Sequence, residues 1–125
     1  MVDEKIAYFT KIINEVLEHL PETFTDKLDN VEFVVEYFPT KEFLKEHGFE
    51  NQMLLGLYAG IPLNRRGVNY NWVLPDRIYI FTEPITFVAS MENISIEEKI
   101  KKVVLHEIGH YFGMSEEELR NLGVY

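Results

Sequence analysis

The segment from Ser95 to Gly113 constrains the fold most, because it carries the beginning, the apolar face and the end of one amphipathic helix. Ser95 is followed three residues later by Glu98, which is the capping-box pattern of a helix start. The apolar residues that follow recur at helical spacing: Ile96, Ile100, Val103 and Val104. Gly113 can adopt the left-handed conformation that ends a helix. The sequence therefore predicts a helix that reaches to about residue 112 and buries one face.

The remaining segments predict an α+β fold. A first amphipathic helix is expected over residues 4–19, before Pro21. Apolar, β-branched or aromatic segments are predicted as strands at 31–38, 53–59 and 77–82. Shorter helices are predicted at 40–46, at 84–90 and after a second capping box at Ser115, and residues 60–77 are predicted as a long exposed loop. We expect a small mixed sheet of three or four strands, with the first helix and the 95–112 helix on one face.

Length and composition exclude several classes of protein. The chain has 125 residues, of which 46% are apolar, and this fits a single domain over residues 1–125. The absence of Cys excludes disulfides, thiolate nucleophiles and Cys-based metal sites. A net charge of −9 has the wrong sign for binding nucleic acid or an anionic membrane. No apolar run is long enough for a transmembrane helix, and no basic leader precedes one, so we expect a cytoplasmic protein.

The residues His106-Glu107-Ile108-Gly109-His110 lie in the second half of the predicted 95–112 helix. Histidines at i and i+4 face the same side of a helix, so both imidazoles can reach one metal ion. Glu107 is turned by about a quarter of a turn from that side, where it can accept a proton from water at the metal. Zinc is the first choice of metal, and nickel or cobalt would fit the same ligands. The alternative is an exposed helix face on which two histidines flank a glutamate.

The pattern continues to Glu116 and reads H-E-x-x-H-x-x-G-x-x-E. A turn at Gly113 would bring the side chain of Glu116 back beneath the two imidazoles. Its carboxylate would complete a set of two His and one Glu, with the fourth position open to water. An acid at this place also has an explanation without a metal, because the first turn of a short helix favours negative charge.

The chain resembles the small bacterial zincin-like metallopeptidases, a minimal form of the zincin fold with a metzincin-like motif. The resemblance covers most of the chain and rests on four segments: LGLYAGIPL at 55–63, PDRIYIF at 75–81, the run from Val104 to Gly113, and LRNLG at 119–123. By similarity, His106, His110 and the residue at 116 bind one zinc ion, and Glu107 is the catalytic acid–base. The family usually has Asp where this chain has Glu116.

The resemblance implies a zinc metalloendopeptidase, a hydrolase that cleaves peptide bonds with a metal-activated water and Glu107 as general base. Its partner would be a peptide or protein substrate, which could pair with the edge strand nearest the cleft. The alternative is a non-catalytic module on the same scaffold that binds a metal or another protein. Tyr70 and Tyr111 are candidate donors to an oxyanion, Arg65 and Arg66 are candidate ligands for a substrate carboxylate, and His19 and His47 are expected on the surface.

Overall fold

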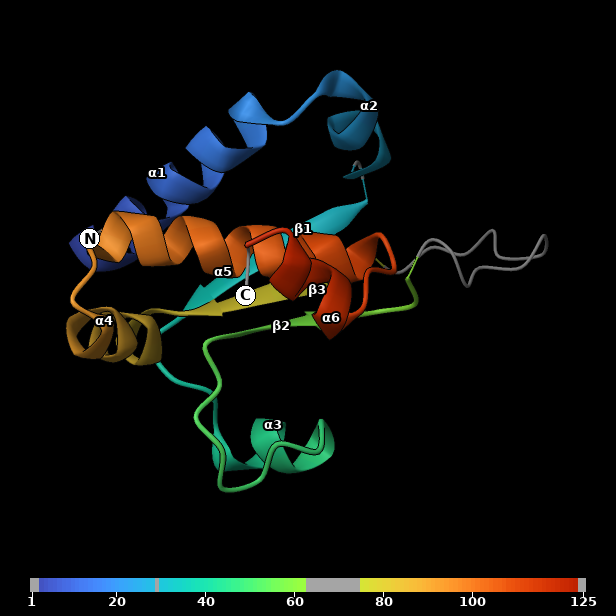
Figure 1. Ribbon diagram of the computed structural model, residues 1–125. Helices are drawn as coiled ribbons and strands as arrows, with labels where there is room; N and C mark the ends of the chain where they lie inside the picture. Colours follow the sequence, from blue (N-terminus) through green and yellow to red (C-terminus); the bar gives the residue numbers. More distant parts are fainter. Residues whose placement is uncertain (1–2, 29, 63–74, 124–125) are drawn as a thin grey trace.

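The computed structural model describes residues 3–28, 30–62 and 75–123 (Figure 1). The first half of the chain forms α1 (Glu4–His19), α2 (Glu22–Thr25), the 3-10 turn η1 (Asp26–Leu28), β1 (Val31–Glu36), α3 (Lys41–Glu46) and β2 (Gly56–Ala59). The second half forms β3 (Asp76–Phe81), α4 (Thr82–Glu92), α5 (Ile96–Tyr111) and α6 (Glu116–Asn121). The expected α+β class, with helices around a small mixed sheet, is confirmed.

The three strands of the described residues form one sheet in the order β1-β3-β2. β1 runs parallel to the central strand β3, with Phe33 opposite Ile78. β2 runs antiparallel to β3 on the other side, with Tyr58 opposite Ile78. β2 is therefore an edge strand, and one of its two sides is not paired with another strand of the described ranges.

The two faces of the sheet are covered differently, because side chains alternate along β3. Ile78 and Ile80 are fully buried and belong to the main hydrophobic core. α1 and α5 pack on each other and against the strands on this face (Figure 1). Tyr79 points to the opposite face, where its ring lies 4.7 Å from that of Phe43 of α3. The position of α5 follows from its apolar residues, of which Ile100 and Val104 are fully buried in the core.

The ends of several elements differ from the sequence-based expectation. The strands predicted at 31–38 and 53–59 are shorter, because β3 ends at Phe81, which lies opposite Glu36 and donates its N–H to the carbonyl of Leu55. Residues beyond that point have no residue of β3 to pair with. The helix predicted at 84–90 is longer and ends at Asn93, which has a φ of 58°. Most of the predicted 60–77 loop, at 63–74, lies outside the described residues.

Two further helical features bear on the region around the site. α2 and η1 are absent from the sequence-based prediction, and they form where Phe24 packs edge-on against Phe112, with ring centroids 5.2 Å apart.

None of the helices in the described ranges is both long and apolar enough to cross a membrane.

Candidate metal centre

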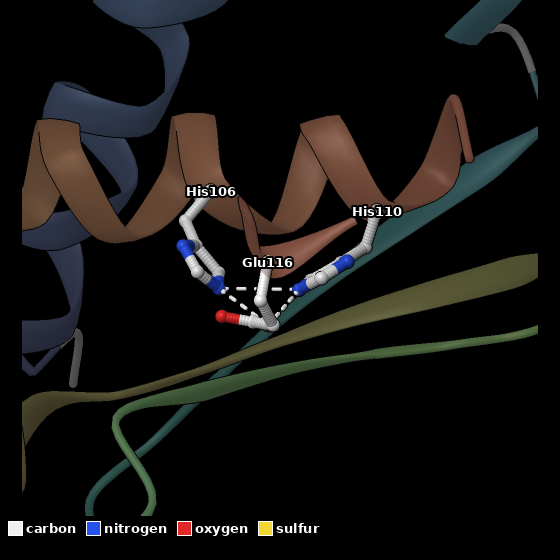
Figure 2. Close-up of side chains that lie close together, drawn as sticks. All are labelled: His106, His110 and Glu116. Atoms are coloured by element: carbon white, nitrogen blue, oxygen red, sulfur yellow. Dashed lines mark hydrogen bonds and ion pairs between the residues drawn. The ribbon is translucent and has the colours of Figure 1, made fainter. Parts of the chain in front are cut away.

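Three predicted site residues meet at the C-terminal end of α5. His106 and His110 project from one face of that helix, and Glu116 at the start of α6 lies between their rings (Figure 2). The Oε1 atom of Glu116 lies 2.6 Å from Nε2 of His110 and 3.2 Å from Nε2 of His106. The two Nε2 atoms are 3.1 Å apart. The spacing of the sequence motif thus does bring the three side chains together.

The turn between α5 and α6 places Glu116. Gly113 has a φ of 88°, a conformation that glycine adopts without strain, and the chain reverses there. The next helix starts with a complete capping box: the Ser115 hydroxyl accepts from the Glu118 N–H, and the Glu118 carboxylate accepts from the Ser115 N–H. The backbone N–H of Ser115, together with its hydroxyl group, lowers the pKa of the Glu118 carboxyl. Glu118 is therefore held by the cap, while Glu116 faces the histidines.

Gly109, inside the motif, allows α6 to approach α5 closely. A Cβ atom on Gly109 would lie only 2.3 Å from Cδ2 of Leu119. Leu119 is the apolar anchor of α6 and is 1% exposed. The motif spacing alone predicts no role for Gly109, although a glycine inside an apolar helix is itself a sign of close packing.

His110 is oriented by a bond on the far side of its ring. Its Nδ1 lies 3.0 Å from the backbone carbonyl oxygen of Met114. A carbonyl oxygen only accepts, so Nδ1 carries the proton in this contact. Nε2, on the other side of the ring, faces His106 and Glu116 and is the nitrogen that a neutral ring with this tautomer would use to bind a metal. This is the arrangement that fixes a metal-binding histidine in the correct tautomer.

Glu107 is buried next to this group rather than inside it. Its side chain is 7% exposed, and Oε1 accepts a hydrogen bond of 2.8 Å from the backbone N–H of Tyr58 in β2. Burial raises the pKa of the Glu107 carboxyl, and the nearby His106 and His110 oppose this rise. A carboxylate with a raised pKa is suited to accept a proton. The backbone N–H of Tyr58 could not be predicted as a partner of Glu107, because a main-chain donor leaves no sequence pattern.

The edge of β2 faces this buried carboxylate. The carbonyl of Leu55 accepts from the N–H of Phe81 in β3, and the same alternation continues along the antiparallel pair. Gly56 and Tyr58 therefore direct their backbone groups away from β3. The bond from Tyr58 to Glu107 agrees with this direction. The edge of β2 and the motif helix α5 thus stand opposite each other.

A cavity of about 440 Å³ lies between these walls. His106, Glu107, His110 and Glu116 all line it. Its other walls come from α4, from β2 and from the segment that leads into β2. Gly56 allows β3 and α5 to approach β2 closely, since a Cβ atom there would lie 2.9 Å from the carbonyl oxygen of Tyr79 and 3.0 Å from a methyl group of Val103.

The donor set fits a zinc ion. Two imidazole nitrogens and one carboxylate oxygen lie within 4.8 Å of one another, so a single ion can reach all three. Two His and one Glu are a ligand set of catalytic zinc, which keeps one position open. The side chain of Glu116 is 54% exposed, which leaves the group accessible from solvent.

The other candidate residues lie elsewhere. Tyr111, a candidate donor to an oxyanion, is buried, and its hydroxyl donates to the backbone carbonyl of Lys27. His19 bonds to the backbone of its own helix, and His47 packs on the ring of Phe43. The remaining candidates lie outside the described residues: Arg65, Arg66 and Tyr70.

Comparisons with known proteins give a family and a fold neighbour. The sequence model of the zincin-like metallopeptidases matches residues 28–124, which include all the residues of the candidate centre. Among solved structures, the chain is similar to a conserved hypothetical protein from T. thermophilus, with 25% identity and a TM-score of 0.54. That alignment covers 86% of this chain and 92% of the other. No curated protein matches the chain.

Proposed function

We infer, since this chain belongs to the zincin-like metallopeptidase family, that it is a zinc-dependent peptidase. The observation that carries the inference is the juxtaposition of two kinds of group in one cavity. His106, His110 and Glu116 converge as a ligand set, and Glu107 lies beside them as a buried carboxylate. Ligands without a base would suit a structural metal site, whereas this pair of features suits hydrolysis.

The three ligand residues would hold one zinc ion through Nε2 of each histidine and the carboxylate of Glu116. When bound, zinc supplies Lewis-acid polarisation of a carbonyl group and makes nearby water more acidic. The bond from Nδ1 of His110 to the carbonyl of Met114 keeps that ring in its binding orientation. The contact between Gly109 and Leu119 holds α6, and hence Glu116, against the histidines.

Glu107 transfers a proton from the attacking water to the leaving amine. One of its oxygens, Oε1, is held by the N–H of Tyr58, so the other oxygen is the one that accepts a proton from the attacking water. The raised pKa of this carboxyl makes the protonated form easier to reach. Glu107 then returns the proton to the amine that leaves when the peptide bond breaks.

The substrate would be an extended peptide or protein segment that lies along β2. The backbone groups of Gly56 point away from β3 and toward the cavity, where a peptide strand can add to the sheet edge. This places the peptide backbone beside Glu107 and the ligand residues. The proposal for the substrate rests on this edge of β2 and on the four side chains that line the adjoining cavity.

The test compares Glu107→Gln with wild type. We expect both proteins to bind about one zinc per chain, because Glu107 is not a ligand in the proposed set. Cleavage of a quenched fluorescent peptide library should fall by at least about 10²-fold in the variant, as is typical for the loss of a general base. His106→Ala serves as the control and should lose both zinc and cleavage.

Two results would contradict these roles. Loss of zinc in Glu107→Gln would make Glu107 a ligand or a support of the ligands. Zinc binding by a wild-type protein that cleaves no member of the library would favour the non-catalytic metal-binding module instead.

A further inference from the structure

An apolar groove of about 740 Å³ lies next to the metal cavity. We define it by residues from the turn after β1, from α3, from the segment 51–54 and from the beginning of α4. Three of its large apolar side chains are exposed: Phe38 at 63%, Met53 at 59% and Phe87 at 54%. Several exposed large apolar side chains in one depression are a mark of a binding surface, since single exposed ones are scattered on ordinary surfaces.

The groove is continuous with the metal cavity. Gln52, Met53 and Leu54 line both hollows, so this segment is their common wall. α4 also borders both, through Val88 on the side of the cavity and Phe87 on the side of the groove. A chain that runs along β2 past its first residue therefore passes this common wall and meets the groove.

We propose that this apolar groove binds a large apolar side chain of the same extended peptide that occupies the metal cavity. The proposal rests on the proposed peptidase function and adds a determinant of substrate choice to it. Side chains of an extended peptide stand out from the backbone alternately, so one near the cleaved bond can enter the groove while the backbone stays on β2.

The lining of the groove argues for an apolar occupant. No Lys, Arg or His is among the described residues that form it, so an acidic side chain would find no positively charged partner there. Its one acid, Glu83, is already paired with Lys5 at 2.5 Å. A basic side chain would therefore compete with an ion pair that exists, whereas Phe, Leu or Met would bury apolar surface against Phe87, Met53 and Phe38.

The experiment measures binding without turnover. Zinc-loaded Glu107→Gln protein is titrated with short labelled peptides of Gly and Ser that carry one Phe at successive positions, and binding is followed by fluorescence polarisation. The same titrations are repeated with two double variants, in which Phe87→Ser or Met53→Ser is combined with Glu107→Gln. Met91→Ser is the matched control, because Met91 is 72% exposed and lies on α4 but not in the groove.

We expect one position of Phe to improve binding over the all-polar peptide. Phe87→Ser and Met53→Ser should each remove at least about fivefold of that improvement, the effect of losing a large apolar contact, and Met91→Ser should leave it unchanged. All three side chains are exposed, so unchanged melting temperatures will show that the variants fold.

Three results would overturn the proposal: no preferred Phe position, an equal loss in Met91→Ser, or no loss in either groove variant. A fourth is that wild type is a dimer which Phe87→Ser separates with peptide binding unchanged, since the groove would then serve a second copy of the chain. Failure of the peptidase function is recognised separately, because it appears as absent cleavage in wild type and leaves the binding differences in place.

Discussion

At the scale of single residues, two acids in the first turn of α6 have different contacts. Glu116 faces His106 and His110, whereas Glu118 closes the capping box with Ser115. The helix dipole favours negative charge at both positions and so does not distinguish them. Their contacts do, and this makes the third ligand open to a direct test.

Glu116→Ala should lower zinc affinity at least about tenfold, because two imidazoles remain where three ligands are typical of zinc. Glu117→Ala removes the same charge from the same turn and is the first control. Glu118→Ala is the second control. It removes one half of the capping box, so it should destabilise the start of α6 and change zinc affinity little. Zinc titrations with a chromophoric chelator decide between the three. Normal affinity in Glu116→Ala would place the third ligand elsewhere.

At the scale of secondary-structure elements, the distance between α5 and α6 depends on one missing methyl group. An Ala in place of a helical Gly usually stabilises a helix by about 1 kcal/mol. We expect that Gly109→Ala does not stabilise this protein and that it weakens zinc binding. The new Cβ would collide with the buried Leu119 and displace α6.

A double-mutant cycle separates these effects. In a Leu119→Ala background the collision is absent, so Gly109→Ala should there be stabilising, as in an ordinary helix. Unfolding by urea gives the four stabilities. Additive effects of the two substitutions would show that the helices do not meet at this pair.

How far the sequence predicts these elements depends on how local their causes are. The apolar spacing and the caps of α1 and α5 predict both helices, and the motif spacing predicts that Glu116 returns to the histidines. The contact of Gly109 with Leu119 and the bond from Tyr58 to Glu107 depend on how distant segments pack together, so no local sequence pattern predicts them. The strand ends likewise depend on where β3 ends.

At the scale of the whole molecule, the ligand group and the core lie on different sides of α5. Ile100 and Val104 are fully buried against the rest of the core, whereas Glu116 is among the more exposed side chains. Zinc would thus join α6 to a helix that is already anchored. Metal removal should affect the C-terminal segment first and the core least.

Treatment of the zinc-loaded protein with a chelator should lower its melting temperature. If free zinc is present at about 100 times its dissociation constant, its removal lowers the free energy of unfolding by about 2.7 kcal/mol. Hydrogen exchange should speed up in α6 and remain slow at Ile100 and Val104. His106→Ala, which lacks a ligand, should not respond to the chelator. Unfolding of the entire chain on chelation would contradict the separation of site and core.

The strand order β1-β3-β2 also has a consequence for the way the protein is made. Both outer strands pair with β3, which spans residues 76–81, so neither has a partner while only the residues before it have left the ribosome. α1 packs mainly on α5, which is made later still, so the burial of its apolar residues Phe9 and Ile12 is incomplete until then. We therefore expect the nascent chain to fold in one step after most of it has been synthesised. Before that step it exposes apolar residues to which chaperones can bind.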